Sequence, residues 1–223
     1  MPVYNEAATV EQAVSDVLEA ELPIAFELIV VDDGSTDGTT AILEAGPWPQ
    51  KVTLLRHERN QGKGAAVRTA LARARGEYAC IFDADLEYDP NDMALLLPPL
   101  LDRTAGAVFG VRAFDGFTSH SYLFVMGNRG CTLVANLLFN VYLKDLMTCH
   151  KAIRTDLFRS LPLSARGFDI EPEIAGRLLS RGERIFEVPV RYSARSTEAG
   201  KKLTWVDGLR VVRMLMRCRL GRA

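Results

Sequence analysis

The first half of the chain alternates apolar runs with amphipathic segments. Continuous apolar runs, several rich in β-branched residues, predict buried parallel strands at 26–32, 51–57, 77–83 and 105–112. Between them lie segments with helical patterns at 5–20, 36–45, 62–76 and 91–102. An acid-rich first turn favours the second of these helices, and Gly76 is the expected C-terminal cap of the third. The alternation predicts a doubly wound α/β fold with a mostly parallel sheet.

The second half follows a different pattern. Residues 119–143 form a long helical stretch whose only charged side chain is Arg129. A short strand is expected at 147–154, an amphipathic helix at 168–182 and an alternating strand at 183–195. The final segment predicts a basic amphipathic helix in which arginines are interleaved with Val, Leu and Met.

Composition narrows the class of protein. The chain has 223 residues, of which 48% are hydrophobic and 25% charged, as in ordinary globular proteins. A net charge of −1 indicates no nucleic-acid partner. No uncharged apolar stretch of membrane-spanning length occurs, and the first residues do not resemble a signal peptide. The four cysteines are scattered, which favours a reducing cytoplasm over a zinc site.

Polar and acidic side chains cluster where predicted strands end. In open α/β sheets, ligands bind beyond the carboxyl ends of the strands. One such cluster alone is as easily explained by helix capping. Three on the same rim favour a ligand site, and their members are Tyr4, Asn5 and Glu6; Asp32 and Asp33; and Asp83, Asp85 and Glu87.

The last cluster indicates a cation. In an extended chain, residues two apart point the same way, so Asp83 and Asp85 would face one side and Glu87 would continue it. Carboxylates crowded in this way repel one another unless a positive charge lies between them. Mg²⁺ and Mn²⁺ prefer oxygen ligands and bridge to phosphates. Short acidic patterns are also common in turns, so the pattern by itself is weak evidence.

Several motifs, in this order and spacing, resemble those of family 2 inverting glycosyltransferases with a GT-A fold. They are "PVYNE", "VVDDGSTDGT", "NQGKGAAV", "DADLEYDP" and "GVR". The later segments "LKDLMTCHKAIR", "FDIEPEI", "EVPVRYSAR" and "GKKLTWVDGLR" resemble the polyprenyl-phosphate branch of that family, which includes dolichol-phosphate mannosyltransferases. The resemblance covers nearly the whole chain. It implies one Rossmann-like GT-A domain, with a nucleotide-sugar half at 1–112 and an acceptor half at 113–223 that carries membrane-associating helices.

The resemblance also implies roles for individual residues. The base and ribose of a nucleotide sugar would be bordered by Pro2, Tyr4, Glu6 and Asp33, with Asp32 as a further candidate. Asp83 and Ala84 would touch the ribose and diphosphate, and Asp85 and Glu87, together with Asp83, would hold Mg²⁺ or Mn²⁺. Many relatives have Gln at the Glu87 position, which leaves the role of this carboxylate open. Arg112 would lie near the sugar phosphate or the acceptor phosphate.

Two groups of basic residues can each be interpreted in two ways. Lys63 in "NQGKG" is either a phosphate ligand or part of a helix N-terminus whose glycines allow close packing, and the segment is no P-loop. Arg195, Lys201 and Lys202 form either a solvated turn or, as the resemblance implies, a lid over the diphosphate and the lipid phosphate.

The helical segments of the second half suggest contact with a membrane. By composition alone, 121–143 reads as a core helix. Its companion, the basic terminal helix, has the pattern of an interfacial helix attracted to anionic lipid, and Trp205 suits an interface as well as a core. The expectation is a cytoplasmic protein that associates peripherally with the cytoplasmic face of a membrane.

The expected reaction is inverting transfer of a hexose, from GDP-mannose or UDP-glucose, to a polyprenyl or dolichyl phosphate. A phosphate monoester is largely ionised at pH 7 and needs cationic neighbours rather than a base. A hydroxyl acceptor, the alternative, requires a general base. Candidates for that base are Asp145, Asp169 and Glu171, although the last two could instead orient basic residues.

Two other readings are weaker. The motifs "VVDDGSTDGT" and "DADLEYDP" argue against a nucleotidyltransferase. The intact acidic residues argue against a scaffolding subunit with a degenerate sugar site. The chain begins at "MPVYNE", whereas relatives have a full strand before this motif. The expectation is therefore that the start is set too late or the chain is trimmed.

Overall fold

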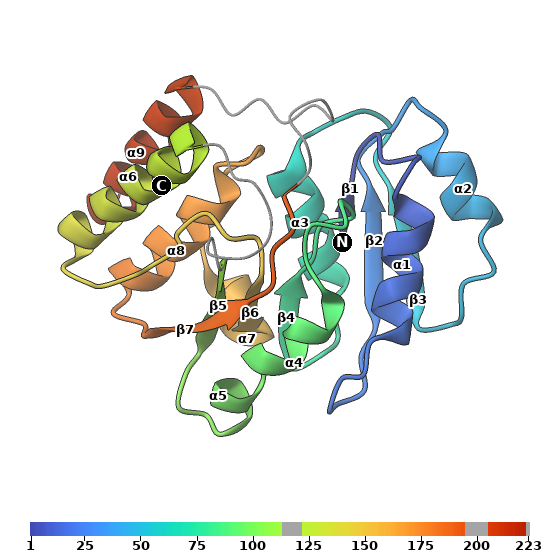
Figure 1. Ribbon diagram of the computed structural model, residues 1–223, viewed down its shortest axis with the longest axis horizontal. Coiled ribbons are helices and arrows are strands. Elements are labelled where there is room, and N and C mark those ends of the chain that lie inside the picture. The colour runs from blue at the N-terminus through green and yellow to red at the C-terminus, as the bar shows by residue number, and fades with distance from the viewer. Residues whose placement is uncertain (113–121, 195–204, 222–223) are drawn as a thin grey trace.

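The computed structural model describes residues 1–112, 122–194 and 205–221. Helices flank two β-sheets, with α1, α2 and the first sheet at one end of the molecule and α6, α8 and α9 packed together at the other (Figure 1). The elements of the first half are β1 (Pro2–Val3), α1 (Val10–Glu19), β2 (Leu28–Asp32), α2 (Thr39–Ala45), β3 (Val52–Arg56), α3 (Lys63–Arg73), β4 (Tyr78–Ile81), η1 (Pro90–Asp92), α4 (Met93–Leu96), α5 (Pro98–Leu101) and β5 (Ala107–Arg112). Those of the second half are α6 (Tyr122–Phe139), β6 (Lys151–Arg154), α7 (Thr155–Ser160), α8 (Ile170–Ser180), β7 (Ile185–Val190) and α9 (Trp205–Arg219).

The strands pair in two groups. The first sheet has the order β1-β2-β3 and is parallel throughout. The second has the order β4-β6-β5-β7, in which β5 and β7 are parallel and β6 runs antiparallel to both of its neighbours. β6 comes from the second half of the chain and lies between β4 and β5. Its first residue, Lys151, therefore pairs with Ile81, the last residue of β4, just before the acidic segment that begins at Asp83.

All predicted strands are present, but three details of the predicted helices are wrong. The first turn of α2 contains no acid, because Gly38 (φ 101°) lies at its N-cap and Asp37 stands outside the helix. α3 ends at Arg73, and Gly76 instead donates its N–H to Glu27. The segment 91–102 is broken into η1, α4 and α5, and the break between α4 and α5 falls at Pro98, which lacks the N–H that a continuous helix needs.

Two large hydrophobic clusters form the core. One packs α1 and β2 against residues that follow β4, and the other packs α6, α8 and α9 against β5 and β6. Each cluster contains residues from both sides of position 112, so the two proposed halves share their core. Within the described part of the chain, no helix combines the length and the apolar character needed to cross a bilayer.

One of the buried polar residues is His150, which lies among aromatic rings. His150 is fully buried, its ring lies 4.5 Å from that of Tyr88 and 5.3 Å from that of Phe82, and neither ring nitrogen has a hydrogen-bond partner among the described residues. Burial lowers the pKa of His150 from 6.5 to about 4. The imidazole is therefore neutral in the folded protein at pH 7.

This burial predicts an acid-sensitive fold. Between pH 6.5 and 4 the unfolded chain binds a proton on His150 that the folded chain does not, so stability should fall as the pH falls through this window. The loss assigned to His150 should approach about 3 kcal/mol at pH 4. We expect His150→Phe, which keeps the ring, to retain more of its pH 7 stability at pH 4 in urea unfolding than the wild type does. Equal losses in both proteins would show that His150 is not responsible.

Candidate active site

The acidic segment after β4 forms a tight turn at residues 84–86 instead of an extended strand. Leu86 has φ 58°, a conformation that branched side chains rarely adopt. Asp85 accepts a hydrogen bond from the backbone N–H of Glu87 at 3.2 Å and remains half-buried. The turn thus presents Asp83 and Asp85 on either side of Ala84, which is buried.

The argument that Glu87 shares a face with Asp83 and Asp85 assumed an extended chain, whereas residues 84–86 form a turn. Glu87 is buried, and its Oε2 accepts a hydrogen bond from the Tyr192 hydroxyl at 2.8 Å. Its role as a metal ligand stays a prediction. The backbone there is also fixed, since Ser193 N–H donates to Glu87 C=O at 2.8 Å. In the described ranges, no three Asp, Glu, His or Cys side chains are grouped as a metal site.

Two carboxylates still fit a divalent cation that a substrate helps to bind. Mg²⁺ in nucleotide-dependent enzymes is typically held by one or two carboxylates together with phosphate oxygens. Asp85 and Asp83 supply hard oxygen ligands of this kind at the end of a strand, so a third protein ligand is unnecessary.

Lys63 joins this turn to the second half of the chain. Its Nζ lies 2.7 Å from Asp83 Oδ2 and 3.0 Å from Glu171 Oε1. Glu171 Oε2 lies in turn 3.1 Å from Lys151 Nζ. We call these four residues, Asp83, Lys63, Glu171 and Lys151, the charge chain. The position of Glu171 between two lysines favours the reading in which it orients basic residues.

The pairing of Lys63 with Asp83 favours the charged form of both side chains. Burial opposes charge on Asp83 and on Lys63, but their mutual attraction outweighs it, so the pKa of Asp83 is lowered and that of Lys63 is raised well above 10.5. Burial lowers the pKa of Lys151, and Glu171 opposes that shift. A single buried charge would be costly, whereas alternating signs offset one another.

The "PVYNE" loop is held against the loop that follows β2. Asn5 N–H donates to Ser35 Oγ at 2.9 Å, and Thr36 N–H donates to Asn5 Oδ1 at 2.8 Å. Glu6 N–H donates to Thr39 Oγ1 at 2.9 Å. Tyr4 is exposed at this rim, while Pro2 lies in β1. The two predicted polar clusters are therefore adjacent.

Asp32 and Asp33 are buried, and their carboxylates accept hydrogen bonds from residues of nearby loops. Asp32 accepts hydrogen bonds from Ser35 N–H at 3.0 Å and from the Thr40 hydroxyl. Asp33 accepts from the N–H groups of Gln61 and Gly62 at 2.9 and 2.7 Å, and lies 2.6 Å from His57 Nδ1. The structure thus gives both carboxylates a loop-holding role that the sequence analysis did not predict, and His57 was missed because it lies alone in the sequence.

Glycines allow α3 to begin against another segment. Gly62 has φ 95°, and a Cβ there would overlap the Arg166 carbonyl oxygen, while Gly64 donates its N–H to the same oxygen at 2.7 Å. The supporting segment is held by Glu173, which accepts from Ser164 and Ala165 N–H groups at 2.7–3.0 Å. The close-packing reading of "NQGKG" therefore fits the structure, and Lys63 adds a link to Asp83.

Arg112 is buried and paired with Asp145. Its Nε and Nη2 donate to the two Asp145 carboxylate oxygens at 2.7 and 2.9 Å, and its guanidinium lies 5.1 Å from the Tyr192 ring centre. Asn128 donates to Asp145 at 3.1 Å. Burial opposes ionisation of Asp145, but the Arg112 side chain lowers the pKa of Asp145 overall. A carboxylate held in this way is unsuited to be the general base considered above.

The remaining predicted residues are partly described. Asp169 is half-buried at the start of α8 and accepts a hydrogen bond from Gly167 N–H at 3.1 Å. Arg129 is exposed on α6. Arg195, Lys201 and Lys202 lie outside the described residues, so the lid stays a prediction.

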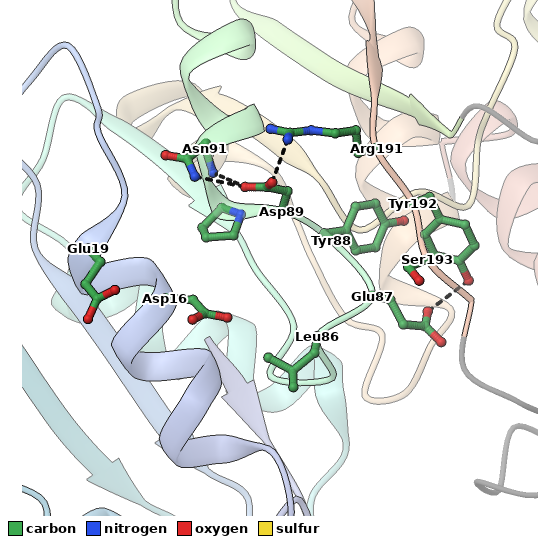
Figure 2. A pocket seen from close by; sticks show the side chains of 11 residues that line it. Asp16, Glu19, Leu86, Glu87, Tyr88, Asp89, Asn91, Arg191, Tyr192 and Ser193 are labelled. Carbon is green, nitrogen blue, oxygen red and sulfur yellow. Dashed lines mark hydrogen bonds and ion pairs between the residues drawn. The ribbon is translucent and has the colours of Figure 1, made fainter. Parts of the chain in front are cut away.

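A cavity of about 590 Å³ lies beside the acidic turn (Figure 2). Its wall combines α1, residues 86–91 and residues 191–193. Arg191 is paired there with Asp89 at 2.8 Å, and the other charged lining residues are Asp16, Glu19 and Glu87. Because this lining is mostly acidic, the cavity is a poor site for a diphosphate.

The sequence of the chain is similar to those of known glycosyltransferases. The sequence profile described as "Glycosyl transferase family 2" matches residues 1–161. A UDP-N-acetylglucosamine–dolichyl-phosphate N-acetylglucosaminyltransferase of Methanococcus voltae is 24% identical over 244 residues, covering 100% of this chain and 95% of that protein. A dolichol-phosphate mannosyltransferase of Pyrococcus furiosus is 25% identical over 205 residues, covering 90% of this chain and 57% of the relative.

A solved structure shows the same architecture. Glucosyl-3-phosphoglycerate synthase of Mycobacterium tuberculosis, in complex with Mn²⁺, UDP and glucosyl-3-phosphoglycerate, matches with a TM-score of 0.74 over 99% of this chain and 77% of that one. The two are 22% identical, so the likeness shows the fold alone. The predicted α/β GT-A fold, with a parallel sheet and flanking helices, is confirmed.

The packing at Gly62 yields a stability prediction. Gly62→Ala should cost more than about 2 kcal/mol, because it adds overlap with the Arg166 carbonyl to the strain of a positive φ. Gly38→Ala is the matched control, since Gly38 has φ 101° but nothing within 4 Å of a Cβ. Its cost, measured by urea unfolding, should be smaller and reflect backbone strain alone. Equal costs would contradict the close contact.

Proposed function

Because the chain belongs to glycosyltransferase family 2, we propose that it transfers a hexose from a nucleotide sugar to a polyprenyl phosphate, with inversion at the anomeric carbon. The observation that carries the donor half of this proposal is the turn that presents Asp83 and Asp85 at the end of β4. The names of the relatives support the acceptor half, since both dolichyl-phosphate enzymes act on a lipid phosphate by name.

The donor would bind across the strand ends of the first half, residues 1–112. Tyr4 and Glu6 lie on the rim where the base and ribose would be bordered. Asp85 and Asp83 would hold Mg²⁺ or Mn²⁺ together with the diphosphate, and the ion would offset charge on the leaving nucleoside diphosphate. Lys63 keeps Asp83 ionised, so that this carboxylate is ready to bind a cation at neutral pH.

The state of the candidate bases supports a phosphate acceptor. Asp145 and Glu171 are both committed to ion pairs with buried cations, which disfavours proton abstraction by either. An acceptor phosphate whose second pKa is about 6 is already ionised at pH 7 and requires no base. Asp169 remains the candidate base for a hydroxyl acceptor.

Two neighbouring helices supply an apolar face for the lipid. On α6, Tyr122, Met126, Leu133 and Leu137 are exposed and recur at helical spacing on one side, with Arg129 among them. On α9, Leu209 and Met216 are exposed near Arg213. Apolar side chains mixed with arginines suit an anionic membrane surface. This supports peripheral association with the cytoplasmic face of a membrane.

Transfer to a lipid phosphate is directly measurable. Incubation with Mn²⁺, a polyprenyl phosphate and labelled GDP-mannose, UDP-glucose or UDP-N-acetylglucosamine should move label into the lipid phase with one of the donors. Transfer to water-soluble hydroxyl acceptors but never to the lipid would contradict the acceptor proposal. Asp85→Ala should lower the rate at least about 100-fold, as loss of a transition-state charge stabiliser does. Asp16→Ala, which removes a carboxylate from the α1 side of the cavity, is the control and should be near the wild-type rate.

The membrane face predicts a binding defect. Leu133→Glu with Leu137→Glu should lower co-sedimentation with phosphatidylglycerol vesicles at least about tenfold, since both side chains are exposed and charges oppose insertion. Leu101→Glu is the control, because Leu101 is also exposed but lies on α5, away from α6 and α9 (Figure 1). Equal vesicle binding by all three proteins would show that this face does not contact lipid.

A further inference from the structure

Lys151 is a fully buried lysine with no role in the sequence analysis. It begins β6, and its backbone pairs with Ile81 at the end of β4, two residues before Asp83. Its Nζ donates to the carbonyl oxygens of Leu146, at 3.1 Å, and Thr148, and lies 3.1 Å from Glu171 Oε2. Two hydrogen bonds and one ion pair therefore surround the ammonium group. The side chain is thereby fixed in one position.

This fixed cation holds one end of the charge chain. The other end, Asp83, belongs to the acidic turn, and Lys63 between them is shared by Asp83 and Glu171. The exposed fraction of the side chains rises from 0% at Lys151 to 21% at Asp83. A change at Lys151, the buried end, should therefore alter the electrostatics of Asp83, the solvent-accessible end, where a ligand would bind.

We propose that Lys151 is a positioning residue for the cation and diphosphate, acting on Asp83 through Glu171 and Lys63. The inference rests on the proposed function, because it assumes that Asp83 helps to bind these ligands. Glu171 divides its two oxygens between Lys151 and Lys63, so Lys151 limits how strongly Glu171 attracts Lys63. Lys63 in turn competes with a bound cation for the Asp83 carboxylate.

The sign of the effect follows from this competition. Without Lys151, Glu171 attracts Lys63 undivided and the Asp83 carboxylate is released from Lys63. This release favours binding of a divalent cation at Asp83. Without Glu171, Asp83 is the carboxylate partner that remains to Lys63 within the charge chain. Lys63 then holds Asp83 more strongly, and cation binding weakens. If Lys151 served packing alone, removing Lys151 and removing Glu171 would not change cation affinity in opposite directions.

The test is calorimetry of Mn²⁺ binding in the presence of saturating UDP or GDP, on the intact chain. Lys151→Met should tighten Mn²⁺ binding at least about threefold, and Glu171→Gln should weaken it by a similar factor. In the Glu171→Gln background, Lys151→Met should change the Mn²⁺ dissociation constant by less than about 1.5-fold, since its route to Asp83 is gone. Thermal denaturation reports any separate loss of stability.

Arg177→Met is the matched control, because Arg177 is a buried cation of α8 that pairs with Glu173 outside the charge chain. It should leave Mn²⁺ affinity unchanged even where it lowers the melting temperature. If Lys151→Met does not fold, the double variant must still match Glu171→Gln. Weaker Mn²⁺ binding in Lys151→Met, or the same effect in both backgrounds, overturns the inference. Failure of the wild type to bind any nucleotide with Mn²⁺ would instead overturn the proposed function.

Discussion

The site depends on one ammonium group, Lys63 Nζ, held between Asp83 and Glu171 at 2.7 and 3.0 Å. It connects the acidic turn after β4 to the first turn of α8, which are almost 90 positions apart in the sequence. Burial alone would raise the pKa of the half-buried Asp83, and Lys63 lowers it. The same lysine begins α3, whose start is fixed by Gly62 and Gly64 against residues 165–166. Helix packing and site electrostatics therefore meet at one residue.

Glu171 and Glu173 show how the second half of the chain supports the first half. Glu173 holds residues 164–165, which in turn support the backbone of the "NQGKG" loop, and Glu171 holds the side chain of Lys63. Both carboxylates come from one turn of α8. Movement of α8 would thus reach the acidic turn by two routes. Since α8 also packs against α9, an acceptor that binds near α9 has a physical path to the donor site.

Much of the fold could be predicted because it is encoded locally. Apolar runs such as Leu28–Asp32 identify β2, β3, β4 and β5 but not the two-residue β1, and helical spacing identifies α1 and α8. The errors arose where a local rule met a competing one. Pro98 interrupts a pattern that is otherwise helical, and the tight turn with Leu86 at φ 58° invalidates the extended-chain argument that placed Glu87 beside Asp85. Pattern alone does not reveal such a backbone conformation.

The sequence predicted only those site residues that lie within a single recognisable motif. The acidic strand end and Lys63 were found, but the pairings of Lys151 and Asp145 were not, because each joins positions more than 15 residues apart. Nothing local distinguishes Lys151 from a surface lysine, and its burial follows only from the place of β6 between β4 and β5. Likewise, the loop-holding roles of Asp32 and Asp33 depend on Thr40, His57 and Gly62.

The most direct test of the central claim is anomalous scattering from crystals grown with Mn²⁺ and UDP or GDP. The account predicts a manganese peak within coordination distance of the Asp85 carboxylate, next to the diphosphate and on the Lys63 side of the acidic turn. A peak in the acidic cavity between α1 and residues 86–91, or a bound nucleotide without manganese at Asp85, would contradict it.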